Sequence, residues 1–196
     1  MLIVEHRINT AARLAEVPPE HGVEVDLRCE GGELVLRHDA VGPAESFDDW
    51  LSGYRHALLI ANVKEEGLET LVLTALATRG ISAFFFLDQS VPFLIKTTAR
   101  GEARCAVRVS EYEATKLATK LAGKARWIWL DCFLGGPPIT AVDAGLLRAY
   151  GYRLCVVSPE LHAPEREAEV PDHVRWARQI GADAVCTKLP DAWGSD

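Results

Sequence analysis

The chain has 196 residues, 48% of them hydrophobic and 25% charged, which is the composition of a soluble globular domain with a sizeable core. Its formal net charge of −7 argues against a nucleic-acid backbone as the main partner, so any phosphate site needs local positive charge. No apolar stretch approaches the roughly 20 residues that a membrane span needs. We expect a single domain over residues 1–196.

The five cysteines form an odd set without C-x-x-C spacing, and most of them lie in or beside apolar runs. This pattern is typical of reduced cysteines in a protein core. No basic-then-apolar leader with a small-residue cleavage site is visible in the sequence. These features predict a cytoplasmic protein.

Short apolar runs rich in Val, Ile, Phe or Trp recur at even spacing, each too short for a helix. They span residues 2–6, 23–28, 57–64, 82–88, 105–110, 126–133, 153–160 and 182–188. This composition is typical of strands that are buried on both faces. The blocks Phe84–Phe86 and Trp127–Trp129 are expected in the core, whereas Trp50 and Trp193 are candidates for an exposed contact surface.

Helical patterns lie between most of these runs. They span residues 68–80, 110–124, 139–151 and 169–181, and the interval 11–19 allows only a short helix. Ser110 and Glu113 have the spacing of a capping box, which predicts that the second of these helices begins there.

The alternation of strands and helices predicts an α/β fold with a parallel sheet, and eight strands fit a closed barrel better than an open sheet. We therefore predict a small (β/α)8 TIM barrel, at the lower size limit of about 200 residues for this fold. Residues 33–39 form an extra strand after Gly31-Gly32, so a β-hairpin follows the second strand. The alternative is a doubly wound sheet, although no G-x-G-x-x-G follows the first strand.

Nearly every apolar run ends in a polar or charged residue. These residues are His6, Arg7, Asp26, Arg28, Asn62, Lys64, Asp88, Gln89, Arg108, Ser110, Asp131, Ser158, Glu160 and Lys188. Active sites of barrels lie at the carboxyl ends of the strands, so the pattern predicts one shared polar site, although strand ends also meet solvent for structural reasons.

Two histidines, His6 and His38, bracket the Glu24-x-Asp26 pair. Two imidazoles can serve as base and acid near neutral pH. Carboxylates at i and i+2 of a strand point the same way and can reach one hard cation. The combination predicts metal-assisted cleavage of an ester, with a phosphodiester favoured. The structural alternative is that both carboxylates form salt bridges with Arg7 and Arg28.

The order of the segments HRINT, VEVDLR, LRHD and NVK resembles the glycerophosphodiester phosphodiesterase superfamily, which includes phosphatidylinositol-specific phospholipase C and sphingomyelinase D. Members of that superfamily are TIM barrels that cleave phosphodiesters with two histidines and usually a divalent cation. The resemblance implies that His6 and His38 are the catalytic pair. It also implies that Glu24 and Asp26 bind Mg²⁺ or Ca²⁺, and that Lys64 lies near the phosphate.

Three departures from the family pattern bear on the site. Ile8 replaces a glycine of the first loop, and the long insertion after Asp39 is missing, so the pocket is expected to be more open. Asn62 replaces a third acidic ligand; its carbonyl can bind Mg²⁺ or Ca²⁺ but adds no charge. The metal site is therefore either weaker or completed by Asp88 or Asp131.

These observations predict a metal-dependent phosphodiesterase, a phosphoric diester hydrolase or a cyclising lyase, that acts on a small glycerophosphodiester-like substrate. The candidate substrate-binding residues are Arg7, Lys64, Arg108, Glu160 and Lys188, of which Arg108 and Lys188 can instead pair with Asp131 and Glu160. Two alternatives remain: a non-catalytic barrel that binds a phosphorylated ligand, and a sugar-phosphate isomerase or lyase.

Overall fold

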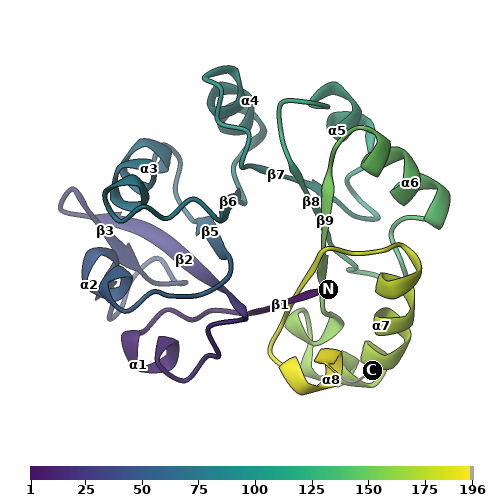
Figure 1. Cartoon of the computed structure of the whole chain (residues 1–196), viewed down its shortest axis with the longest axis horizontal. Coiled ribbons are helices and arrows are strands. Elements are labelled where there is room, and N and C mark those ends of the chain that lie inside the picture. The colour runs from purple at the N-terminus through teal and green to yellow at the C-terminus, as the bar shows by residue number, and fades with distance from the viewer. Residues whose placement is uncertain (195–196) are drawn as a thin grey trace. The chain divides into compact units, whose positions relative to one another are not determined.

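The structure is a computed structural model in which residues 1–194 are described. The elements, in chain order, are β1 (Leu2–Glu5), α1 (Ala11–Leu14), β2 (Gly22–Glu30), β3 (Glu33–Leu36), β4 (Glu45–Ser46), α2 (Phe47–Ser52), β5 (Leu59–Val63), α3 (Glu69–Thr78), β6 (Phe84–Leu87), α4 (Val91–Ala99), β7 (Ala106–Val109), α5 (Lys116–Lys120), β8 (Trp127–Leu130), α6 (Ala141–Ala149), β9 (Arg153–Val157), the 3₁₀ helices η1 (Pro159–Leu161) and η2 (Pro164–Glu169), α7 (Val170–Gln179), β10 (Ala184–Thr187) and α8 (Pro190–Gly194). Strands alternate with helices along the chain, which confirms the predicted α/β class (Figure 1).

The chain divides into two compact units. The N-terminal unit comprises Glu5–Arg100, and the C-terminal unit comprises Met1–Val4 together with the residues from Gly101 onward. None of the helices in residues 1–194 is long and apolar enough to span a membrane.

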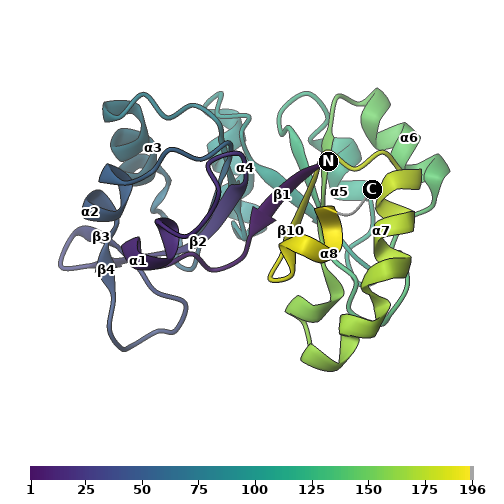
Figure 2. The same ribbon diagram turned by 60° about the horizontal axis from the view of Figure 1, so that its bottom comes forward.

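The N-terminal unit contains a sheet in the order β4-β3-β2-β5-β6. β2, β5 and β6 are parallel. β3 and β4, which are labelled beside β2 in Figure 2, continue antiparallel from β2. The hairpin predicted after the second strand is therefore confirmed. The register places Asp26 opposite Asn62, so their side chains lie on the same face of the sheet.

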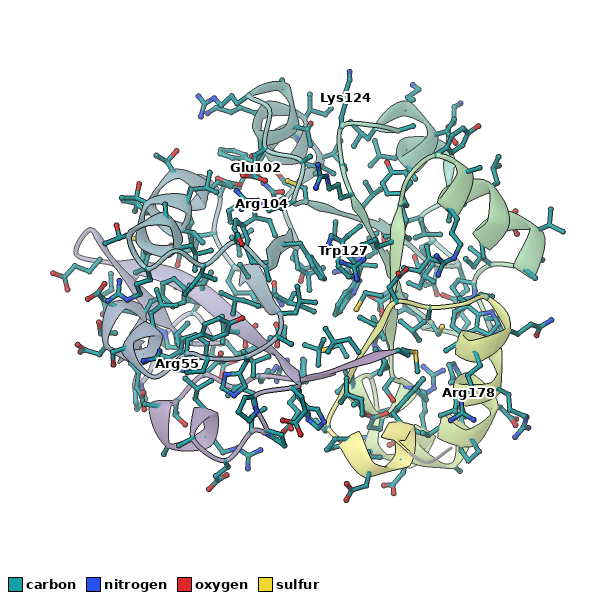
Figure 3. All side chains as sticks on the ribbon, viewed as in Figure 1. Arg55, Glu102, Arg104, Lys124, Trp127 and Arg178 are labelled. Atoms are coloured by element: carbon teal, nitrogen blue, oxygen red, sulfur yellow. The ribbon has the colours of Figure 1, made fainter. Side chains whose placement is uncertain are left out.

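The C-terminal unit contains strands in the order β1-β10-β9-β8-β7, and β7 to β10 pair in parallel. Their residues are nearly all buried, as expected for strands covered on both faces. Before β7, Glu102 and Arg104 lie side by side as an ion pair of 2.6 Å (Figure 3). At the amino end of β8, the guanidinium of Arg153 lies 4.5 Å from the ring centroid of Trp127.

Each of the eight apolar runs overlaps a strand, and the aromatic blocks lie in the core as predicted. The prediction that a helix begins at Ser110 is wrong, because α5 starts at Lys116. Ser110 and Glu113 do bond to each other, but within a turn that precedes the helix. The prediction of exposed tryptophans is also wrong: Trp50 is 0% exposed and Trp193 is 3% exposed. Closure of the strands into a barrel and the single domain over 1–196 stay predictions.

Candidate active site

The centre of the candidate site is the carboxylate pair of β2. Glu24 and Asp26 point to the same face of the sheet and are 1% and 0% exposed. The amide of Asn62, on the neighbouring strand β5, donates from Nδ2 to Glu24 Oε1 at 2.8 Å and lies 3.4 Å from Asp26 Oδ1. The register of β2 and β5 is therefore what brings a single amide to both carboxylates.

The loop after β1 is bonded tightly to this pair. The backbone N–H of Arg7 donates to Glu24 Oε2 at 2.8 Å, and Asn9 Nδ2 donates to Asp26 Oδ2 at 2.8 Å. Asn9 Oδ1 in turn accepts from the backbone N–H of Asp26. Arg7 has a φ of 55°, in the left-handed region that few residues other than glycine adopt. Such strain persists only where the surroundings hold it, and here the bonds to β2 do so.

The two predicted catalytic histidines lie against the same cluster. His6 Nε2 is 3.8 Å from Glu24 Oε2. His38 Nε2 is 2.6 Å from a terminal nitrogen of Arg7, and His38 Nδ1 is 2.9 Å from Asp39 Oδ1. Because a guanidinium only donates, a neutral His38 accepts at Nε2 and carries its proton on Nδ1, where it donates to Asp39. Arg7 thus links His38 to the carboxylate pair.

Arg28 and Asp39 hold His38 in place. Arg28 donates from two of its guanidinium nitrogens to the backbone carbonyl of His38, at 2.9 and 3.3 Å. The hydrogen bond from His38 lowers the pKa of Asp39, so this carboxyl stays ionised. Arg28 therefore fixes the backbone of His38, and Asp39 orients its imidazole ring.

Lys64 lies at the carboxyl end of β5. Its ammonium is 3.1 Å from Asp26 Oδ1 and 3.6 Å from Asp88 Oδ2, and its side chain is 17% exposed. Asp88 follows β6 and has a φ of 60°, the second non-glycine residue with positive φ among the described residues. A cavity of about 150 Å³ beside Lys64 is lined by Asp88, Gln89 and Ser90, among others.

Burial raises the pKa of Glu24 to about 7, and the adjacent charge of Asp26 adds to the shift. The hydrogen bonds from Asn62 and from the Arg7 backbone oppose this increase, as does the charge of Lys64. Near neutral pH the two buried carboxyls therefore carry less than two full negative charges.

Three further predicted site residues belong to the C-terminal unit. Arg108 is paired with Asp131 at 3.0 Å, and His162 Nε2 lies 2.6 Å from the same carboxylate. Glu160 is buried, and one of its oxygens accepts from the Thr187 hydroxyl at 2.7 Å and the Lys188 backbone N–H at 3.0 Å. Its other oxygen accepts from the Ser158 hydroxyl. Glu160 thus anchors the chain that follows β10, and the roles of all three residues in substrate binding stay predictions.

Sequence reasoning did not assign a site role to Asn9 and Trp50. Asn9 bonds to Asp26 through both polar atoms of its side-chain amide, and Trp50 Nε1 donates to the backbone carbonyl of Ile8 at 3.0 Å. Asn9 lies two residues after the His6-Arg7 motif, and this position was a usable signal. The contact of Trp50 spans 42 positions of the chain and left no local signal.

The described residues contain no group of three or more His, Cys, Asp and Glu side chains arranged to hold a metal ion. Of the predicted ligands, Glu24 and Asp26 lie close together and Asn62 presents its amide nitrogen to both. Their assignment as metal ligands stays a prediction.

Two solved structures are similar to this chain over nearly its whole length. One is a glycerophosphodiester phosphodiesterase from Agrobacterium tumefaciens, with a TM-score of 0.67 and 17% identity, covering 98% of this chain and 97% of the other. This chain has the fold of that phosphodiesterase. The second, a glycerophosphoryl diester phosphodiesterase from Parabacteroides distasonis, has a TM-score of 0.64 and 14% identity, with coverage of 98% and 84%.

The likeness to glycerophosphodiester phosphodiesterases that the order of the motifs predicts is thus confirmed by structures with little sequence identity. No family model matches the sequence, and no curated protein matches it. The activity therefore has to be argued from the residues of the site.

Proposed function

We propose that this chain is a phosphodiesterase that cleaves a small glycerophosphodiester-like substrate with His6 and His38 as its acid–base pair. The observation that carries the proposal is the position of Arg7. Its backbone binds Glu24, its guanidinium lies 2.6 Å from His38, and it directly follows His6 in the chain. Both imidazoles and the Arg7 guanidinium, a candidate phosphate-binding group, therefore belong to one cluster on a fold shared with phosphodiesterases.

His38 is the better candidate for the general base. A carboxylate at Nδ1 orients an imidazole and stabilises the imidazolium that forms when Nε2 takes a proton, and Asp39 has this position. Arg7 now lies against Nε2, but its side chain is 42% exposed, so it can turn to a phosphoryl oxygen and leave Nε2 to the nucleophile. The nucleophile is water, or a neighbouring hydroxyl of the substrate if the product is a cyclic phosphate.

His6 is then the general acid, which donates a proton to the leaving alkoxide. Its Nε2 lies 3.8 Å from Glu24 Oε2, which holds the imidazole beside the carboxylate pair. Arg7 and Lys64 hold the phosphoryl oxygens and stabilise the negative charge that develops on them. Arg108, Glu160 and Lys188 remain candidate substrate-binding residues.

The divalent cation predicted from the sequence would be held by Glu24, Asp26 and the carbonyl of Asn62. The donor set fits this poorly, because nitrogen donors already lie against the oxygens of both carboxylates and the amide presents nitrogen to them. The mechanism above therefore uses only groups of the chain. We further infer that the strands form the (β/α)8 arrangement that the sequence predicts, because the similarity to the Agrobacterium enzyme covers 98% of the chain.

Hydrolysis of glycerophosphodiesters and of bis-p-nitrophenyl phosphate tests the proposal. We expect turnover by the wild type and a loss of about 10² or more in kcat/KM for His6→Ala and for His38→Ala. His56→Ala is the matched control, because His56 is a half-buried histidine whose Nε2 lies 3.1 Å from the Val17 carbonyl instead.

Two results would contradict the proposal: no turnover by the wild type, or turnover in His6→Ala and His38→Ala that equals the turnover of the wild type and of His56→Ala. Phosphate binding without turnover would favour the alternative of a non-catalytic protein for phosphorylated ligands. Conversion of a sugar phosphate would favour the isomerase or lyase.

A further inference from the structure

We propose that the carboxylate pair of this site takes its counter-charge from Lys64 and is further stabilised by N–H donation from the Asn62 amide, and that the site does not take up a divalent cation. The part of this proposal in which Lys64 binds phosphate rests on the proposed phosphodiesterase function. The absence of a cation site is a separate claim, which binding measurements test without turnover.

Each carboxylate oxygen of the pair already has a nitrogen donor within 3.1 Å. For Glu24 these donors are Asn62 Nδ2 on Oε1 and the Arg7 backbone on Oε2, both at 2.8 Å. For Asp26 they are Lys64 Nζ on Oδ1 at 3.1 Å and Asn9 Nδ2 on Oδ2 at 2.8 Å. A cation bound to either carboxylate would share an oxygen with one of these donors, and at Asp26 Oδ1 that donor is the Lys64 ammonium, which would repel it.

The orientation of the Asn62 amide follows from the charge around it. Nδ2 faces Glu24 and Asp26, and Oδ1 is buried without a hydrogen-bond partner among the described residues. Rotation of the amide by 180° would bring Oδ1 against two carboxylate oxygens, which is unfavourable unless a cation lies between them. Asn62 is therefore an N–H donor where the family pattern has a carboxylate.

Lys64 supplies the positive charge at the open side of the pair. Its ammonium bridges Asp26 and Asp88 and is largely buried, so solvent screens it little. A divalent ion bound to Asp26 Oδ1 would lie next to this ammonium and be repelled by it. A third carboxylate could offset that repulsion, but Asn62 is neutral.

Lys64 and Arg7 then bind the phosphoryl oxygens and neutralise their negative charge, as a divalent cation otherwise would. Both contact Asp26, Arg7 through Nε at 3.9 Å, and both side chains keep a solvent-accessible part. A lysine and an arginine fixed by a buried carboxylate form a preorganised binding site for phosphoryl oxygens.

The test is titration of Mg²⁺, Ca²⁺ and Mn²⁺ into the chelator-treated full chain. Binding is measured as heat by calorimetry and as a change in Tm by thermal unfolding. For the wild type we expect neither binding heat nor a rise in Tm up to about 10 mM cation. Asn62→Asp supplies an isosteric third carboxylate and should bind with a Kd of about 1 mM or tighter. Lys64→Met removes the competing ammonium and should also gain affinity, which provides a second variant if Asn62→Asp does not fold.

Wild-type binding with a Kd below about 1 mM would overturn the proposal. Absence of binding in both variants would overturn the roles of Asn62 and Lys64. In the hydrolysis assay, activity that survives chelator supports the proposal, and activity that requires a cation overturns it while leaving the phosphodiesterase assignment intact. If no substrate is turned over, the proposed function fails and the titrations still decide whether the site takes a cation.

Discussion

Among single residues of the candidate site, Glu24 has the most perturbed ionisation. It is nearly completely buried beside a second carboxylate, and its pKa is raised to about 7. Hydrogen bonds from the Asn62 amide and the Arg7 backbone favour its charged form and partly oppose this increase. This perturbation distinguishes Glu24 from a surface carboxylate and makes folding sensitive to pH.

We expect Glu24 to make folding less favourable as the pH rises. Because the folded chain binds this proton more tightly than the unfolded chain, its contribution is fully present below pH 4.5 and is lost as the pH rises to about 7. In Glu24→Gln, the free energy of unfolding should therefore fall less between these pH values. Urea unfolding at several pH values measures this, with exposed Glu20→Gln as the control. An unchanged slope in Glu24→Gln would contradict the prediction.

At the scale of elements, α2 supports the loop that carries His6 and Arg7. Ser46 caps this helix by accepting from the backbone N–H of Asp49. Trp50 of α2 is fully buried, stacks on Phe47 with 5.9 Å between ring centroids, and donates to the carbonyl of Ile8. One side chain therefore joins the helix core to the first loop of the site.

Trp50→Ala should lower the free energy of unfolding by about 3–5 kcal/mol, because it removes a large buried ring and leaves a cavity. Trp50→Phe should cost less, since it retains an aromatic ring and loses only the hydrogen bond to Ile8 and part of the volume. Urea unfolding of both variants measures the difference. Val41→Ala, at a side chain that is 83% exposed, should change stability little, and an equal loss there would argue against a specific role for Trp50.

Over the whole molecule, the cysteines differ in exposure. Cys29 is half-buried, and the other four are buried. Burial raises the pKa of Cys132 to about 12 and also raises the pKa of Cys155, so both stay protonated thiols at neutral pH. This distribution agrees with the reduced core cysteines that the sequence predicts.

We expect a thiol reagent such as Ellman's reagent to modify one cysteine rapidly in the native chain and all five after denaturation. Cys29→Ser should abolish the rapid phase and reduce by one the number of cysteines that are modified after denaturation. Rapid native modification of several cysteines would show that the buried strands open readily, contrary to the burial described here.

The sequence alone determined the eight apolar strands, the hairpin that follows the second of them and the face that Glu24 and Asp26 share. These follow from local rules: apolar runs of strand length are buried, a Gly-Gly pair permits the tight turn, and side chains two apart on a strand point the same way. The order of the His, Glu-x-Asp and His-Asp segments also predicted the structural likeness to phosphodiesterases that the two solved structures confirm.

Only the tertiary structure decided what these residues contact. The bridge of Arg7 to His38, the Asn62 amide against both carboxylates and the burial of Trp50 depend on contacts between segments that lie 31 to 42 positions apart. Sheet register and helix packing set such contacts, and no local pattern encodes them. The late start of α5 has a local cause instead, because Ser110 and Glu113 bond to each other within a turn that precedes the helix.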